Sequence, residues 1–198
     1  MDMKYALSLL LILFSFASYA QQHQLGIRMG DPYGITYKTP VKDKFSFEAI
    51  LGRGSQNSSQ YYRRTFENNR PVSSARYFGH QVSGAFSLHA RGIYEESFSD
   101  DFNISEGDLT VYAGLGLQFR SVNIDYFYTT PNASPNTPEV IESRTNMDFG
   151  PEVFLGTAYY FKDLPISIFL EVGFMTEIVD RLHLKAQGAI GARYLFGN

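Results

Sequence analysis

The sequence predicts an all-β protein, a closed antiparallel up-and-down transmembrane β-barrel of eight strands. Apolar and polar residues alternate in segments that are separated by turn signals, which is the period of β-strands. In these segments one phase is apolar and aromatic, whereas the other carries the charged residues. After the N-terminal segment no apolar run is long enough for a spanning helix, so strands must make any membrane crossing.

The first residues have the pattern of an export signal. Lys4 is positively charged, residues 5–17 are apolar, and small residues at Ser18 and Ala20 suit a cleavage site. The apolar run is shorter than the about 20 residues that a spanning helix needs. We therefore expect residues 1–20 to be a signal peptide and residues 21–198 to form an outer-membrane β-barrel domain.

The composition excludes several classes of function. The formal net charge of -3 argues against nucleic-acid binding. The chain has no cysteine, which excludes disulfides, thiolate metal sites and a lipid-attachment cysteine. The acidic stretch 95–108 lacks the spacing of an EF-hand, so we expect no metal and no cofactor.

Residues 25–51 predict three short strands in meander order. The first two are separated by the turn signal at residues 31–34, and the third follows the polar residues 42–44. Residues 25–41 have an alternative interpretation, a single long strand bent at Pro32 and Gly34.

The remaining chain predicts five more strands. They cover residues 80–94, 109–120, 149–161, 166–178 and 182–196. Long loops are expected at residues 53–79 and 121–147, with an extension of the strand over residues 123–129 left open. The short connections at residues 42–44 and 162–165 then share one rim with both termini, as in bacterial barrels, and the long loops lie at the other rim.

Five segments resemble the small outer-membrane β-barrel family of the OmpA/OmpX type. The resemblance lies in residues 26–30 with 34–38, residues 48–52, the turn at residues 160–165 and residues 191–196. It implies a monomer in the outer membrane, in contact with membrane lipid and lipopolysaccharide. Within the last segment Gly191, Tyr194 and Phe196 look like the signal that the barrel assembly machinery reads.

Charged residues collect on the phase that faces the barrel interior. An eight-stranded barrel is filled by its own side chains, so buried charges must pair. One interpretation is a structural ion-pair network, and the other is a gated narrow pore in which Glu48, Glu152 or Glu171 switches partners. The residues of this predicted lumen network are Arg28, Lys38, Glu48, Arg91, Glu152, Glu171, Lys185 and Arg193, with His89 among them.

The predicted loop 53–79 is rich in arginine and aromatic residues. Guanidinium groups bind phosphate well, and the outer leaflet presents phosphorylated lipid A. We expect this loop to bind lipopolysaccharide or an extracellular protein, and a merely solvated loop is the alternative. The residues concerned are Arg63, Arg64, Arg70, Arg76, Tyr61 and Tyr62.

A catalytic function requires a nucleophile and a base within hydrogen-bond reach. His89 and His183 are expected to face inward and His80 lies near Ser83, but the spacing forces no cluster of serine, histidine and acid. We therefore expect no enzyme but an outer-membrane barrel with a structural, adhesive or surface-recognition role. The alternatives are a narrow pore or an accessory subunit of an envelope secretion or transport complex, and third a lipid A-modifying enzyme. A soluble lipocalin-like barrel would have the reverse orientation, apolar inside.

Overall fold

The computed structural model describes residues 22–130, 140–179 and 182–197. Its eight strands pair antiparallel in chain order, and β8 closes the ring on β1. The predicted eight-stranded barrel is therefore confirmed, whereas the expected signal peptide lies outside the described residues. The elements are β1 (His23–Gly30), β2 (Tyr33–Lys42), β3 (Phe45–Arg53), α2 (Ser59–Asn68), β4 (Arg76–Ser97), β5 (Gly107–Thr129), β6 (Val140–Phe161), β7 (Ile166–Glu177) and β8 (His183–Phe196).

The first two strands form a tight hairpin and not one bent strand. Asp31 and Pro32 reverse the chain, and Leu25 of β1 lies opposite Tyr37 of β2. Gly30 precedes this turn with a φ of 134°, a conformation that side chains rarely adopt, and a Cβ there would collide with the carbonyl oxygen of Gly188. Glycine is therefore required where the hairpin meets β8.

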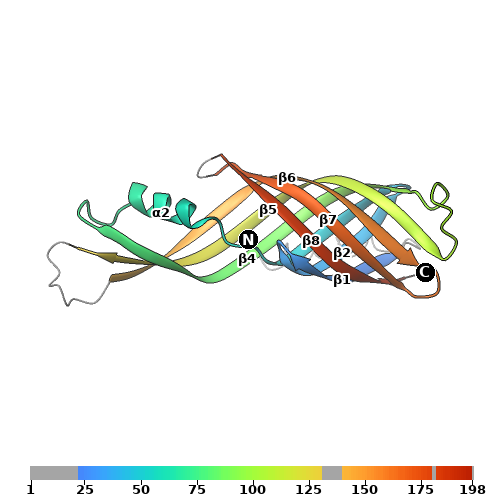
Figure 1. The fold of residues 1–198 in the computed structure, drawn as a ribbon, viewed down its shortest axis with the longest axis horizontal. Coiled ribbons are helices and arrows are strands. Elements are labelled where there is room, and N and C mark those ends of the chain that lie inside the picture. Colours follow the sequence, from blue (N-terminus) through green and yellow to red (C-terminus); the bar gives the residue numbers. More distant parts are fainter. Residues whose placement is uncertain (1–21, 131–139, 180–181, 198) are drawn as a thin grey trace, which may run out of the picture.

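Three strands are much longer than the other five (Figure 1). β3 pairs with β4 only as far as Ser87, and β7 pairs with β6 only from Glu152 onward. Beyond these points β4, β5 and β6 continue as a three-stranded sheet, which we call the extension: residues 76–86, 121–129 and 140–151. The opposite end of the barrel, which we call the turn end, carries the connections 43–44, 98–106 and 162–165 and the C-terminus.

The prediction of two long loops was wrong over most of their length. Residues 53–79 contain α2 and the start of β4, and residues 121–147 belong largely to β5 and β6. The acidic connection is also shorter than predicted, since β4 runs to Ser97 and β5 begins at Gly107. The reason lies in β5, where the buried face is polar at Gln118 and Arg120 inside the barrel but apolar from Val122 onward in the extension. The interior thus changes from polar to apolar where the strand leaves the barrel.

Helix α2 covers the inner face of the extension. Ser58 caps its N-terminus by accepting a hydrogen bond from the Tyr61 N–H (3.3 Å). Tyr61, Tyr62 and Phe66 are buried on one side of the helix and pack against the apolar residues of β5. A ten-residue helix is marginal in isolation, so this packing is what stabilises α2.

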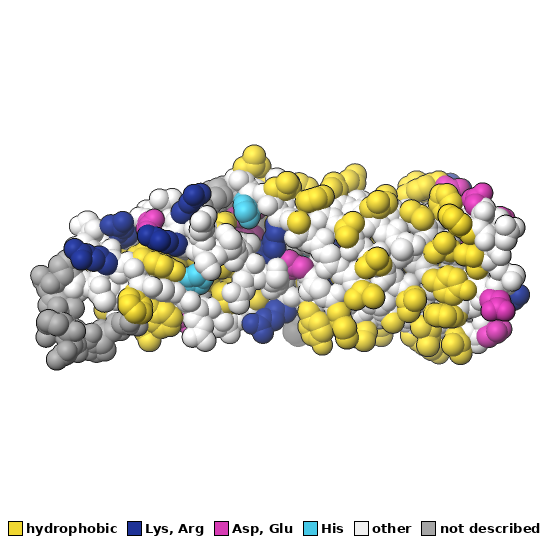
Figure 2. Space-filling view, in the orientation of Figure 1, with side chains coloured by type: hydrophobic (Ala, Val, Ile, Leu, Met, Phe, Trp, Pro, Cys, Tyr) yellow, Lys and Arg dark blue, Asp and Glu magenta, His cyan; other side chains and the backbone are white. Residues whose placement is uncertain are grey.

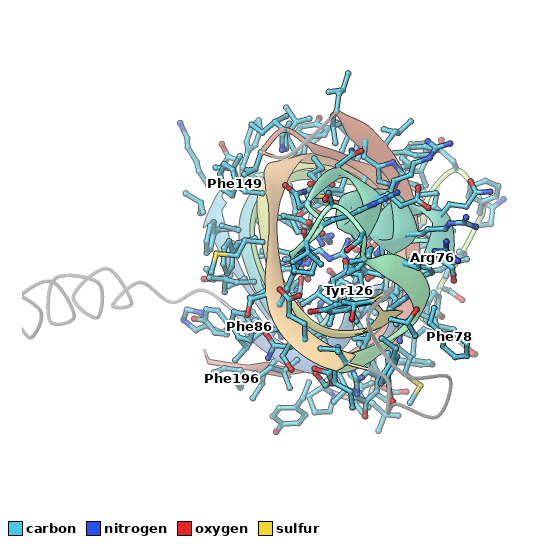
Figure 3. The ribbon with its side chains drawn as sticks, turned by 90° about the vertical axis from the view of Figure 1, so that its left-hand side faces the viewer. Arg76, Phe78, Phe86, Tyr126, Phe149 and Phe196 are labelled. Atoms are coloured by element: carbon cyan, nitrogen blue, oxygen red, sulfur yellow. The ribbon has the colours of Figure 1, made fainter. Side chains whose placement is uncertain are left out.

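The outer surface of the barrel is an apolar belt (Figure 2). Figure 3 looks into the barrel from the extension: Tyr126 lies inside the ring, whereas Phe86, Phe149 and Phe196 point away from it. Apolar side chains outside and charges inside exclude the soluble lipocalin-like alternative. In the described part of the chain no helix is long and apolar enough to span a membrane. Residues of the belt include Leu25, Ile27, Ile35, Leu88, Leu115, Leu117, Leu155, Ile168, Leu170 and Ile190.

Candidate functional site

Three arginines and three glutamates meet in the middle of the barrel, and we call them the central network. They are Arg28, Arg91, Arg193, Glu48, Glu152 and Glu171, and each is at most 3% exposed. The ion pairs join Arg193 to Glu48 (2.6 Å), Arg91 to both Glu152 and Glu171 (2.7 Å each), and Arg28 to Glu171 (2.9 Å). The guanidinium groups of Arg91 and Arg193 also lie over the rings of Phe154 and Phe169. The network is neutral as a set, which is what burial of charge requires.

The two predicted lysines of the lumen lie outside the central network. Lys38 is nearer the turn end, where it pairs with Glu95 and donates to the Tyr160 hydroxyl (3.2 Å). Lys185 pairs with Asp31 (2.9 Å) at the other mouth, so its predicted membership of one ion-pair network with Glu48, Glu152 and Glu171 was wrong. Lys185 lies near the start of β8, about 26 Å of strand before Arg193 at roughly 3.3 Å per residue.

Residues 54–57 close the barrel mouth beside the extension, and we call them the plug. The Ser55 N–H and hydroxyl both donate to the Asp31 carboxylate (2.8 and 2.5 Å), and Lys185 donates to the Ser55 carbonyl (2.8 Å). Asn57 donates to Asp148 of β6 (3.2 Å). At the turn end the lumen is instead an open cavity of about 740 Å³, which ends before the central network.

The extension carries a positively charged surface. Arg63, Arg64, Arg70 and Arg76 are exposed, and Figure 2 shows Lys and Arg side chains gathered over this half of the molecule. Arg63 pairs with Glu67 (2.8 Å). Burial lowers the pKa of His80, so this histidine is neutral at pH 7 and the positive charge comes from arginine.

Tyr61 and Tyr62 do not belong to that surface, so their predicted part in a loop surface that binds lipopolysaccharide or an extracellular protein was wrong. They are 4% and 0% exposed because they lie on the apolar side of α2. Burial raises the pKa of Tyr62, whose hydroxyl accepts a hydrogen bond from the Asn57 N–H (3.0 Å). Both tyrosines thus hold α2 and the plug in place. The prediction also missed Arg144 of β6, whose guanidinium lies over the rings of Phe66 and Tyr126.

The residues of the predicted assembly signal lie near the turn end of β8. Tyr194 and Phe196 are exposed on the apolar belt. Gly191 leaves room for the ring of Phe169, which a Cβ would strike. Their recognition by the barrel assembly machinery stays a prediction.

One further cluster was not foreseen. The Ser87 hydroxyl lies 2.8 Å from Nε2 of His89, and Nδ1 of His89 lies 3.0 Å from the Glu152 carboxylate. The sequence interpretation noted that His80 lies near Ser83, expected no cluster of serine, histidine and acid, and overlooked Ser87. The available signal was the spacing of Ser87 and His89, which places both on the inner face of one strand.

No family model matches the chain, and no curated protein matches it. Among solved structures it is similar to the N-terminal β-barrel domain of Pseudomonas aeruginosa OprF, with a TM-score of 0.51, 11% identity, and coverage of 89% of this chain and 96% of that chain. The chain has the fold of an outer-membrane β-barrel. A major outer membrane protein from Thermus thermophilus is also similar, with a TM-score of 0.47, 11% identity, and coverage of 90% of this chain and 100% of that chain. Together this fold and the apolar belt are those of an outer-membrane protein.

We expect this outer-membrane barrel to show no discrete openings in planar lipid bilayers, because the plug and the central network block its lumen. The measurement is single-channel recording on the purified folded protein, with a larger porin as the positive control. Reproducible openings of the pure protein would contradict this expectation and favour the gated pore.

Proposed function

We propose that this barrel acts by surface recognition, with the arginines of the extension binding the phosphate groups of lipopolysaccharide. The observation that carries the proposal is the charge of residues 53–76, which contain five arginines and one glutamate as the only formally charged side chains. In the described residues Arg64, Arg70 and Arg76 form no ion pair, so they are available to an anionic ligand. Guanidinium groups bind phosphate with two parallel hydrogen bonds.

The charge at the two ends of the barrel supports the proposed binding of lipopolysaccharide by the extension. In bacterial barrels with an even number of strands, the termini and the short turns lie in the periplasm. The extension then projects from the cell surface, next to the phosphorylated outer leaflet. The turn end carries the acidic residues Glu95, Glu96, Asp100, Asp101, Glu106 and Asp108, so positive charge is concentrated on the lipopolysaccharide side.

The triple variant R64A/R70A/R76A is expected to bind lipopolysaccharide about tenfold more weakly at low salt, since three exposed charge pairs at about 0.5 kcal/mol each amount to that factor. The measurement is titration of the detergent-solubilised barrel with purified lipopolysaccharide. Added salt is expected to reduce the difference.

The matched control is K42A/K44A/K162A, which removes three exposed positive charges at the turn end. It is expected to bind as the unmodified protein does. Unchanged affinity of the arginine variant, or an equal loss in the lysine variant, would argue against the proposal.

A second candidate is an extracellular protein partner bound at the edges of the extension. Residues 76–86 of β4 and 140–148 of β6 have no strand on their outer edge in the described residues. Such edges can accept an additional strand through backbone hydrogen bonds. Binding of this kind would depend little on salt, which distinguishes it from phosphate binding.

A further inference from the structure

Ser87, His89 and Glu152 form a hydrogen-bonded chain inside the barrel. Ser87 and His89 are two residues apart on β4, and Glu152 comes from β6 across the intervening β5. The serine hydroxyl faces one ring nitrogen of His89 (2.8 Å), and the carboxylate faces the other (3.0 and 3.1 Å to its two oxygens). Serine hydrolases activate their nucleophile with this order of groups.

Glu152 is held rigidly by a second residue. Arg91 donates from Nε and Nη2 to the two carboxylate oxygens of Glu152 (2.7 and 2.8 Å). The fixed carboxylate accepts the Nδ1–H of His89, which leaves Nε2 to accept the hydroxyl proton of Ser87. Glu152 and Arg91 are thus positioning residues for His89.

The two residues of β5 that pair with Ser87 and His89 each carry a buried donor without an acceptor. Arg120 is the direct strand partner of Ser87, and Gln118 is the direct partner of His89. Arg120 is 1% exposed and Gln118 is 0% exposed, yet Nε of Arg120 and Nε2 of Gln118 have no hydrogen-bond acceptor in the described residues. A buried N–H without an acceptor is costly, and it is the group that an oxyanion site supplies.

The plug separates this cluster from the barrel mouth. A Cβ placed on Gly54 would lie 3.0 Å from Nε of Arg120 and 3.6 Å from Cβ of Ser87, so Gly54 packs against both residues. The neighbouring Ser55 is held by hydrogen bonds with Asp31, Lys185 and Arg120. These contacts can break without opening the barrel wall.

We propose that Ser87 and His89 are the catalytic residues of a carboxylic-ester hydrolase site, which a small ester enters when the plug is displaced. The Ser87 oxygen attacks the acyl carbon and its proton passes to Nε2 of His89, while Arg120 and Gln118 donate to the developing oxyanion. His89 returns the proton to the alcohol oxygen as the ester C–O bond breaks. A water molecule, deprotonated by His89, then attacks the acyl-serine, and Ser87 and a carboxylic acid are released.

The test is covalent labelling of the folded full-length barrel with a small alkyl fluorophosphonate, followed by mass spectrometry of the peptides. We expect a single adduct on Ser87, its absence in S87A, and a labelling rate at least about a hundredfold lower in H89Q. The matched control is S167A, because Ser167 is equally buried but has no histidine partner in the described residues. This control is expected to label as the unmodified protein does.

The variant D31N/K185M weakens the plug contacts outside the cluster and is expected to label about tenfold faster. Hydrolysis of a short-chain p-nitrophenyl ester is expected to follow the same order among the variants. Gel migration of heated and unheated samples verifies that each variant is folded. Absence of an adduct on Ser87 in both the unmodified protein and the plug variant would overturn the proposal, as would equal labelling of H89Q.

Discussion

Replacement of Arg91 by methionine is expected to lower the free energy of unfolding of the barrel by about 3–5 kcal/mol. Arg91 contacts three buried carboxylates, those of Glu48, Glu152 and Glu171. The variant R91M leaves two of them without their shortest ion pair in an environment that excludes water. The measurement is urea unfolding in detergent followed by gel migration, because the chain has no tryptophan for a fluorescence assay.

The control for R91M is R63M on α2. Arg63 also pairs with a glutamate, but its side chain is 63% exposed, so we expect a change of at most about 0.5 kcal/mol. Adding E152Q to R91M is expected to recover part of the loss, because this substitution removes the one surplus negative charge and leaves Glu171 paired with Arg28. A loss below about 1 kcal/mol in R91M would contradict the view that Arg91 neutralises the lumen.

Replacement of Phe66 by alanine is expected to release α2 from the extension. Phe66 is 0% exposed, and its ring centroid lies 5.4 Å from those of Tyr126 and Tyr128. Truncating a buried phenylalanine costs about 3–5 kcal/mol, and α2 is too short to remain helical alone. Limited proteolysis of the folded protein is expected to show faster cleavage within residues 54–75.

The barrel itself is expected to withstand F66A, because Phe66 packs against the part of β5 that lies in the extension, beyond the closed ring of strands. Gel migration and urea unfolding of the barrel are therefore expected to stay unchanged. The control V72A alters a neighbouring side chain that is 47% exposed, and it is expected to leave cleavage unchanged. Equal cleavage of F66A and the unmodified protein would contradict the role of Phe66.

The membrane-spanning part of the fold can be read from the sequence because one rule holds throughout it. Lipid and lumen impose opposite polarity on alternate residues, so the phase of Arg28, Glu48 and Arg193 identifies the inner face of their strands. The extension does not obey this rule. Once β5 leaves the barrel, the apolar side of α2 packs on its inner face. Val122 and Ile124 lie on this face, which carries polar residues inside the barrel.

The candidate sites are only partly predictable for a related reason. Strand periodicity predicts which face of the strand a residue occupies, but it does not predict the position of its side chain along the barrel axis. Lys185 and Arg193 share a face and yet pair at opposite ends of β8, with Asp31 and with Glu48. The proximity of Glu152 to His89 depends on the register of β5 between β4 and β6, which no local pattern contains.

Two ion pairs of the central network connect strands on either side of the junction between β1 and β8. Arg28 of β1 pairs with Glu171 of β7, and Arg193 of β8 pairs with Glu48 of β3. The ribosome synthesises Glu48 early and Arg193 near the end of the chain. An incomplete chain therefore contains Glu48 without the arginine that forms its shortest ion pair in the folded barrel. Addition of β8 therefore closes the ring of strands and, at the same step, neutralises the charge of the barrel interior. A truncated polypeptide would carry surplus negative charge into the bilayer, which penalises insertion of incomplete copies.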